Sequence, residues 1–261
     1  MRKIEVKRNG PGINIKPDHS TIHRPFHHPR RSFSYQYLQI TIDACIQTAF
    51  ELNQDIEMKG YYFITDSKLS RAGNRSDVLA AVSCGVETIQ YRNKNAETRE
   101  MYQEALVLAQ ICRDAGSLFL INDRLDVAMA VGADGVHVGQ TDMPCSKTRR
   151  LLGRGKMIGV TVHSLVEALQ AEREGADYLG VSPIYQTATK PDAGKPAGIR
   201  LIEEIRERVS LPLIAIGGIN HSNAPEVVQA GADGLCAISC VVAEDDVRSQ
   251  IRRFQELFVR V

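Results

Sequence analysis

The sequence has no tryptophan, no Cys-x-x-Cys pair, no long apolar run and almost no net charge. Its six cysteines are widely spaced, which excludes a compact zinc site and a small disulfide scaffold and favours reduced thiols. No apolar run approaches the roughly 18 to 20 residues of a membrane span, and the charged start does not resemble a signal peptide. Lys and Arg number 32 against 31 Asp and Glu, so the net charge is +1. The charge of the whole chain therefore gives no indication of nucleic-acid binding. We therefore expect a cytoplasmic protein without membrane or nucleic-acid partners.

The N-terminal part differs in composition from the rest. Residues 1–35 carry four of the seven histidines, a basic cluster and four prolines that break any periodicity, which predicts a flexible basic arm. Apolar residues at helical spacing then predict an amphipathic helix within 41–57: Ile42, Cys45, Ile46, Ala49 and Phe50. We expect residues 1–57 to be an N-terminal extension and residues 58–261 to be the catalytic domain, with Met58 as a candidate for the true start.

From Tyr61 onward, short β-rich runs alternate with helical patterns. Eight runs predict strands: Tyr61–Thr65, Glu87–Tyr91, Leu118–Ile121, Gly135–Val138, Met157–Thr161, Tyr178–Val181, Leu213–Ile216 and Leu235–Ile238. Helical patterns separate most of them: Ala96–Ala115, Ser164–Gly175, Gly198–Val209 and Ser222–Ala230. Eight such units in about 200 residues predict a (β/α)8 barrel, the TIM-barrel fold. A doubly wound open sheet is the alternative, disfavoured because no Gly-x-Gly-x-x-Gly follows the first strand.

A Gly-Ala-Asp triplet recurs three times, at residues 132–134, 175–177 and 231–233. Each copy closes a helix and opens a strand. We interpret the triplets as turn chemistry, in which Gly supplies a left-handed backbone position and Asp supplies a side-chain bond to the backbone. They belong at the N-terminal ends of the strands, away from the chemistry.

Polar residues gather at the other ends of the strands, where a barrel of this kind carries its active site. Arg92 and Lys94 follow the second run and are two residues apart, so they point to the same side of an extended segment. Lys190, after the sixth run, adds a third cation. Cations grouped in this way suit a polyanion such as diphosphate. A solvated charged loop is the alternative.

Two carboxylates, Asp123 and Asp142, end successive runs of the predicted sheet. Facing a polyphosphate they would repel each other unless a cation lay between them. Magnesium suits this position because it prefers hard oxygen ligands, usually one or two carboxylates together with phosphate oxygens. The alternative for Asp123 is a helix N-cap.

A second phosphate site is predicted at the ends of the last two strands. Gly217 and Gly218 follow the seventh run and Ser239 follows the eighth, as in the phosphate-binding region of many barrels. Two phosphate sites at one mouth indicate an enzyme with two substrates. The loop from Tyr185 to Gly198, rich in Thr, Lys, Pro and Gly, is a candidate lid over them.

Two histidines lie near this mouth. His137 falls inside the fourth run, and we expect it to be a satisfied core histidine. His163 follows the fifth run, where a catalytic role and a helix cap both stay open.

Taken together, these motifs resemble the thiamine phosphate synthase family, from about residue 61 to the C-terminus. The resemblance rests on Gln90-x-Arg92-x-Lys94, Asn122-Asp123-Arg124-x-Asp126, the stretch from Gly132 to Asp142, Thr187-x-Thr189-Lys190, Ile216-Gly217-Gly218-Ile219 and Ile238-Ser239. The family joins an aminopyrimidine methyl diphosphate to a thiazole phosphate and releases diphosphate.

The resemblance also implies roles for individual residues. The pyrimidine diphosphate would be held by Gln90, Arg92, Lys94, Asn122, Thr161 and Lys190. Of these, Arg92, Lys94, Lys190 and Thr161 would be catalytic, and Asp123 and Asp142 would bind Mg2+. The thiazole phosphate would contact Thr187, Thr189, Gly218, Ile238 and Ser239.

The chain departs from the family at Thr161, where a Ser is usual, and the retained hydroxyl predicts retained function in a tighter pocket. Two alternatives stay open: a related thiazole tautomerase, in which His163 would act, and a non-catalytic phosphate-binding barrel. The expected partners are two phosphorylated small molecules. The sequence neither requires nor excludes a homo-oligomer, and it does not distinguish an aromatic from a carboxylated thiazole.

Overall fold

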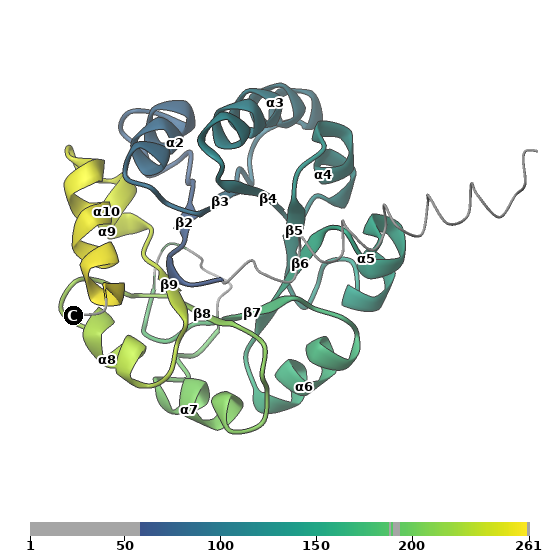
Figure 1. The fold of residues 1–261 in the computed structure, drawn as a ribbon, viewed down its shortest axis with the longest axis vertical. Coiled ribbons are helices and arrows are strands. Elements are labelled where there is room, and N and C mark those ends of the chain that lie inside the picture. Colours follow the sequence, from purple (N-terminus) through teal and green to yellow (C-terminus); the bar gives the residue numbers. More distant parts are fainter. Residues whose placement is uncertain (1–57, 188, 190–193, 260–261) are drawn as a thin grey trace, which may run out of the picture. The chain divides into compact units, whose positions relative to one another are not determined.

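The computed structural model describes residues 58–187, 189 and 194–259. The basic arm and amphipathic helix predicted within residues 1–57, and Lys190, lie outside this part of the chain. Within it, parallel strands close into a ring surrounded by helices (Figure 1). The predicted (β/α)8 barrel is confirmed.

The strands follow the predicted runs closely. They are β1 (Gly60–Tyr61), β2 (Phe63–Ile64), β3 (Thr88–Tyr91), β4 (Leu118–Asn122), β5 (Gly135–Val138), β6 (Met157–Val162), β7 (Tyr178–Val181), β8 (Leu213–Ile216) and β9 (Gly234–Cys236). Every neighbouring pair is parallel, β1 with β9 and β2 with β3. β1 and β2 are two parts of one run on either side of Tyr62. Counted as one strand, they give an eight-stranded barrel that these pairings close.

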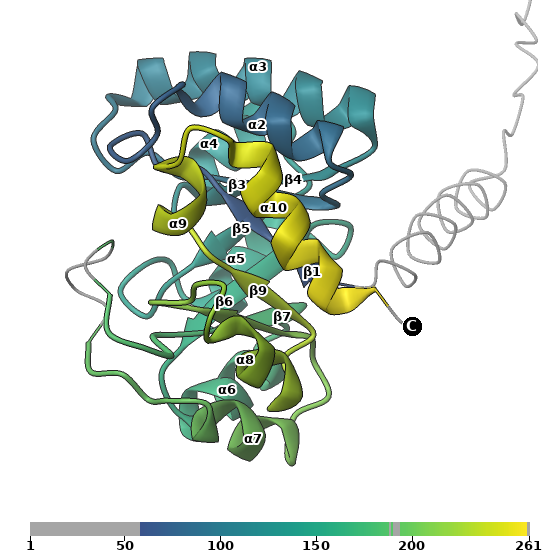
Figure 2. The same cartoon turned by 90° about the vertical axis from the view of Figure 1, so that its left-hand side faces the viewer.

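The helices lie on the outside of the ring (Figure 2). They are α2 (Asn74–Ser83), α3 (Thr98–Ala115), α4 (Leu125–Val131), α5 (Cys145–Leu152), α6 (Leu165–Arg173), α7 (Arg200–Arg206), α8 (Ala224–Gln229), α9 (Ser239–Val242) and α10 (Val247–Gln255). Ser164 caps α6 by accepting a hydrogen bond from the main-chain N–H of Glu167. No helix of the described residues is long and apolar enough to cross a membrane.

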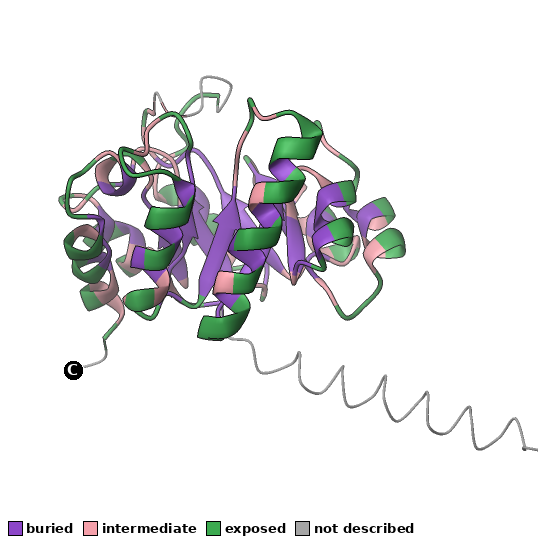
Figure 3. Ribbon diagram, turned by 90° about the horizontal axis from the view of Figure 1, so that it is seen from above, coloured by how far each residue is buried: buried purple, intermediate pink, exposed green. Residues whose placement is uncertain are grey.

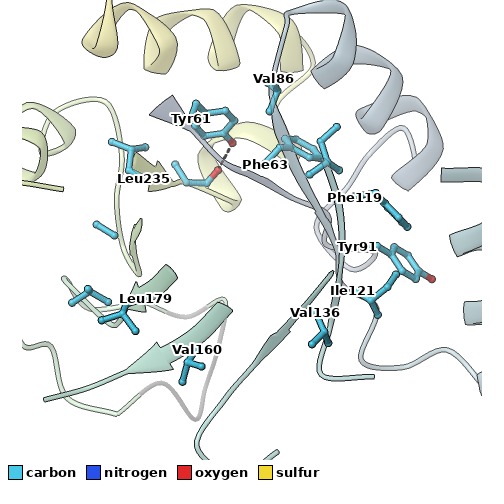
Figure 4. Close-up of a cluster of buried hydrophobic side chains, with 14 of the residues drawn as sticks. Tyr61, Phe63, Val86, Tyr91, Phe119, Ile121, Val136, Val160, Leu179 and Leu235 are labelled. Carbon is cyan, nitrogen blue, oxygen red and sulfur yellow. Dashed lines mark hydrogen bonds between the residues drawn. The ribbon is translucent and has the colours of Figure 1, made fainter. Parts of the chain in front are cut away.

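The apolar core has two layers. Strand residues are buried, while each helix turns a buried face inward and an exposed face to solvent (Figure 3). Side chains such as Phe63, Phe119 and Leu179 lie between barrel and helices (Figure 4). A smaller cluster includes Tyr62, which alternates in direction with its neighbours Tyr61 and Phe63, as strand geometry requires. The remaining members of that cluster are Met58, Ile64, Leu120, Met157, Tyr178, Ile214 and Cys236.

The Gly-Ala-Asp triplets join neighbouring strands at the N-terminal end of the barrel. Each Asp accepts a main-chain N–H from the preceding strand in the chain: Asp134 from Phe119 at 2.9 Å, Asp177 from Ile158 at 2.6 Å and Asp233 from Leu213 at 2.8 Å. The predicted side-chain bond to the backbone is therefore present, and it reaches across to another strand. The triplets connect strands and take no part in the cavity described below.

Two of the triplets also bind an arginine from the helix before that preceding strand, one helix earlier than the helix that ends at the triplet. Arg149 of α5 donates to Asp177 at 2.5 Å and to the carbonyl of Gly175 at 2.9 Å. Arg206 of α7 likewise donates to Asp233 and to the carbonyl of Gly231. The carboxylate thus fixes a strand start and a helix end together.

Replacing Asp233 by alanine is expected to lower the free energy of unfolding by about 2 kcal/mol. The variant loses the bond from the Leu213 N–H and leaves the partly buried Arg206 without its carboxylate. Equilibrium urea unfolding measures the change. Asp245→Ala is the control, because the Asp245–Arg71 pair is exposed and should contribute close to nothing. Equal losses in both variants would contradict this role of the triplet.

Candidate active site

One cavity of about 270 Å³ opens among the C-terminal ends of the strands. All the predicted site residues that the structure describes line it: Gln90, Arg92, Lys94, Asn122, Asp123, Asp142, Thr161, Thr187, Thr189, Gly218, Ile238 and Ser239. They come from positions spread over about 150 residues of sequence, and the closure of the barrel brings them together. Lys190 is the predicted site residue that lies outside the described part of the chain.

Arg92 is held in place by a buried carboxylate. Its Nη1 donates to Asp66 Oδ2 at 2.8 Å, and its main-chain N–H donates to Thr65 Oγ1 at 2.9 Å. The other oxygen of Asp66 accepts the main-chain N–H groups of Lys68 and Leu69, so the carboxylate itself is fixed by the loop after β2. One guanidinium N–H is thereby bonded to Asp66. The guanidinium is held in place, and its other N–H groups are available to an anion in the cavity. Nothing in the sequence analysis singled out Asp66, whose one visible signal is its place directly after the first strand.

Lys94 and Asp123 form an ion pair across the mouth, with Lys94 Nζ 2.8 Å from Asp123 Oδ2. Asp123 has a left-handed backbone, with φ of 61°, which Asp tolerates better than most residues. Its main-chain N–H donates to the carbonyl of His137 at 2.8 Å. The N-cap alternative fails, because Arg124 is the N-cap residue of α4 and no side chain caps that helix. The Asp123 carboxylate therefore belongs to the cavity.

Asp142 faces Asp123. Its Oδ2 accepts the main-chain N–H of Gly139 at 2.8 Å. Burial raises the pKa of Asp142 above its ordinary value, and the nearby Asp123 carboxylate raises it further, while the Gly139 bond and Lys94 act in the opposite direction. Two hard oxygen donors that repel each other fit a divalent cation such as magnesium. Among the described residues no group of three or more His, Cys, Asp or Glu is placed to hold a metal. A cation here would take its other ligands from water or substrate oxygens.

The opposite side of the cavity is built on a glycine turn. Gly217 and Gly218 follow β8 with φ of 103° and 65°. A Cβ on Gly218 would lie 2.4 Å from the carbonyl oxygen of Gln186, so a larger residue does not fit there. Thr187 Oγ1 accepts the main-chain N–H of Thr189 at 3.2 Å, which keeps these two hydroxyl residues together. This region is uncharged among the described residues that line it and contrasts with the charged side around Arg92.

The candidate lid is anchored where it meets the barrel. The main-chain N–H groups of Ala197 and Gly198 donate to the carbonyls of Pro183 and Ile184 at 2.9 and 3.0 Å. Closure of the loop over a substrate stays a prediction, because Lys190 and its neighbours lie outside the described residues.

Both histidines also line the cavity. His137 has both ring nitrogens hydrogen-bonded, Nδ1 to Tyr178 and Nε2 to Thr161, which agrees with a satisfied histidine. His163 Nδ1 lies 2.5 Å from the carbonyl oxygen of Ser182, and its main-chain N–H donates to Glu167 beside the start of α6. A chemical role for His163 stays a prediction. The sequence analysis did not identify Tyr62 and Tyr178, which also line the cavity but look like ordinary strand residues.

A barrel that gathers two cations, two facing carboxylates and a glycine turn around one cavity is an enzyme of the (β/α)8 class with a site for phosphorylated substrates. A family model described as "Thiamine monophosphate synthase" matches residues 61–241. The chain belongs to the thiamine phosphate synthase family, and it is a transferase of thiamine biosynthesis that releases diphosphate and acts on phosphorylated thiamine precursors.

Similar proteins cover the same part of the chain. "Thiamine-phosphate synthase" of Chloroflexus aurantiacus is 53% identical over 197 residues, which are 75% of this chain and 91% of that protein. "Thiamine-phosphate synthase" of Methanosarcina barkeri is 48% identical over 200 residues, 77% of this chain and 90% of that protein. The solved structure of "Thiamine phosphate pyrophosphorylase" from Pyrococcus furiosus superposes with a TM-score of 0.71 at 41% identity, covering 77% of this chain and 96% of that one. Neither a thiazole tautomerase nor a non-catalytic barrel accounts for this agreement.

Proposed function

We propose that the cavity joins 4-amino-2-methyl-5-pyrimidinylmethyl diphosphate to a thiazole ethyl phosphate, or to its carboxylated form. The bond between the pyrimidine CH2 and the diphosphate oxygen breaks, and its electron pair leaves with diphosphate. The thiazole nitrogen then donates its lone pair to the CH2 carbon, giving thiamine phosphate. With the carboxylated thiazole as substrate, the same product also requires that the carboxylate leave as CO2. The observation that carries this proposal is the division of one cavity into a charged side and a glycine-turn side.

The charged side would hold the pyrimidine diphosphate. Arg92 and Lys94 both line the cavity and would neutralise the negative charge that grows on the leaving oxygens. Because Asp66 and Asp123 already orient these cations, little reorganisation is needed as the reaction proceeds. The remaining contacts to this substrate are assigned to Gln90, Asn122, Thr161 and Lys190, of which Thr161 and Lys190 would also be catalytic.

Asp123 and Asp142 would hold Mg2+ beside the diphosphate. When bound, the ion supplies positive charge against the leaving group. The chain's own contribution there is to fix the two carboxylates, one through the Gly139 N–H and the other through Lys94.

The glycine-turn side would hold the thiazole phosphate. We assign its contacts to Thr187, Thr189, Gly218, Ile238 and Ser239. Held there, the thiazole nitrogen meets the pyrimidine CH2 as the diphosphate leaves, so positioning supplies much of the rate. No general base is required, because the nucleophile carries no proton to remove.

The proposal extends to the organisation of the chain. Residues 58–261 would form the catalytic domain, residues 1–57 an extension outside it, and the enzyme would be cytoplasmic. Its partners would be the two phosphorylated small molecules, with no role for nucleic acid or membrane.

The experiment is a reaction of the full chain with both phosphorylated halves, followed by chromatography for thiamine phosphate and diphosphate. We expect both products in equal amounts, and neither when one half is omitted. Diphosphate release without thiamine phosphate, or no product with both halves and magnesium present, would refute the proposal.

Replacing Asp66 by asparagine is expected to lower kcat/KM about tenfold, because Arg92 loses the charged partner that orients it. Asn keeps the size and one oxygen for the loop after β2. Asp245→Asn is the matched control, since it weakens an exposed Arg–Asp pair neither of whose residues lines the cavity. Equal activity of the two variants would show that Asp66 does not position Arg92.

A further inference from the structure

Five polar side chains form a continuous run of hydrogen bonds across the inside of the barrel, here named the interior chain: Gln90, Tyr62, Tyr178, His137 and Thr161. Gln90 Nε2 donates to the Tyr62 hydroxyl at 2.8 Å, and the Tyr62 and Tyr178 hydroxyls lie 2.8 Å apart. The Tyr178 hydroxyl is 2.9 Å from His137 Nδ1, and His137 Nε2 is 2.8 Å from Thr161 Oγ1. The run thus connects two residues, Gln90 and Thr161, that the proposed function assigns to the pyrimidine diphosphate.

Two strand glycines make room for the interior chain. A Cβ on Gly159 of β6 would lie 2.1 Å from Tyr178 Cζ and 2.5 Å from His137 Nδ1. A Cβ on Gly180 of β7 would lie 2.9 Å from His137 Cε1. Neither glycine has a left-handed backbone, so space is the reason for both. Because glycine weakens a strand, two such positions indicate that the interior chain is a built feature of the barrel.

The hydroxyl protons of the two tyrosines are buried with them. Burial raises the pKa of both Tyr62 and Tyr178, so each phenol keeps its proton. The Tyr62 hydroxyl accepts from Gln90, so its own proton needs a different acceptor. Among the described residues, the Tyr178 hydroxyl is the acceptor within hydrogen-bond distance. Tyr178 then donates to His137 Nδ1, and the Nε2–H of His137 donates to Thr161 Oγ1.

Hydrogen bonding in the opposite direction along the interior chain would leave a buried donor without an acceptor among the described residues. If His137 Nδ1 carried the proton and donated to Tyr178, Tyr178 would donate to Tyr62, and the Tyr62 proton would be buried with no recorded acceptor in the described part of the chain. An unsatisfied buried donor is more costly than a bond between neutral partners is favourable. In the first direction the hydroxyl protons of both tyrosines and the ring proton of His137 each have an acceptor within the interior chain, and the hydroxyl proton of Thr161 does not.

We propose that the interior chain makes the Thr161 hydroxyl a hydrogen-bond donor toward the substrate. Because a Thr161 lone pair is occupied by His137 Nε2–H, the hydroxyl proton turns to the cavity and selects an acceptor atom, such as a ring nitrogen of the pyrimidine. Tyr178 and His137 are positioning residues that act through Thr161. This inference rests on the proposed function for the identity of the substrate, and on the geometry alone for the tautomer of His137.

The tautomer is measured directly in the full chain without substrate, by 15N NMR of the histidine rings. We expect His137 to be neutral with the proton on Nε2 and an unprotonated Nδ1. Its resonances are identified by their displacement in Thr161→Val. A proton on Nδ1 would overturn the inference, whatever substrate the enzyme takes. Because the wild-type protein is used, this test does not depend on the folding of any tyrosine variant.

Kinetics test the effect on the substrate. Tyr178→Phe removes the donor to His137 Nδ1, so we expect the KM for the pyrimidine diphosphate to rise about tenfold while the KM for the thiazole phosphate stays unchanged. Tyr91→Phe is the matched control: Tyr91 is also buried, but its hydroxyl donates to Glu104, which is not part of the interior chain. Equal KM values in the two variants would overturn the inference.

A double-mutant cycle shows whether Tyr178 acts through Thr161. Thr161→Val alone should raise the same KM, Thr161→Ser should restore it, and Tyr178→Phe should add little in the Thr161→Val background. Fully additive effects would contradict action through Thr161. A wild-type enzyme that forms no thiamine phosphate would refute the proposed function and leave the tautomer result standing by itself.

Discussion

Replacing Arg92 by alanine is expected to lower kcat by about 1000-fold, the typical cost of removing a group aimed at developing charge. The guanidinium is oriented by Asp66 before any substrate arrives, so its contribution falls on the leaving diphosphate. The loss should appear mainly in kcat, because the charge it meets is largest in the transition state. Steady-state kinetics with both substrates measure it.

Two controls accompany this variant. Arg71→Ala removes an arginine from an exposed pair with Asp245 and should leave kcat unchanged. Arg92→Lys keeps the charge but loses the planar guanidinium with its several N–H donors. We expect its activity to lie between those of the wild-type enzyme and the Arg92→Ala variant. A kcat of Arg92→Ala within tenfold of the wild-type value would show that Arg92 takes no part in the chemical step.

Replacing Asp123 by asparagine is expected to abolish the dependence on magnesium together with at least 99% of the activity, a loss of about 100-fold or more. Asn is preferred to Ala here because it tolerates the left-handed backbone at this position, where φ is 61°. The change therefore removes the charge without straining the turn. Activity is measured over a titration of magnesium, with wild type in excess chelator for comparison.

Asp114→Asn is the matched control for charge. Asp114 is exposed on α3 and accepts a bond from Gln110 on the same helix, so its variant should respond to magnesium as wild type does. Wild-type turnover that persists unchanged in a chelator would refute the assignment of Asp123 and Asp142 as magnesium ligands.

The barrel could be predicted because its strands are marked by local pattern. The runs Gly135–Val138, Tyr178–Val181 and Leu213–Ile216 have the same bounds in sequence and structure. The last run was predicted too long: β9 ends at Cys236, because Ile238 is already the N-cap residue of α9. The polar residues directly after the strands were enough to predict which side chains line the cavity, since parallel strands bring their C-terminal ends to one face.

Residues that act through others left no such pattern. Asp66 looks like an ordinary loop carboxylate until the fold brings Arg92 beside it. Tyr62 and Tyr178 look like apolar strand positions, and their hydroxyls meet only because β1, β2 and β7 face one another across the barrel. Gly159 likewise looks like a weak point in a strand until the Tyr178 ring occupies its side-chain position. Contacts across the barrel are long-range, and no local spacing encodes them.

The most direct test of the central claim is a crystal structure of the chain with thiamine phosphate, diphosphate and magnesium. The account predicts diphosphate against Arg92 and Lys94, with magnesium between it and the two carboxylates, and the thiamine phosphate group against Gly218 and Ser239. Diphosphate bound elsewhere, or the two phosphate groups on exchanged sides of the cavity, would contradict it.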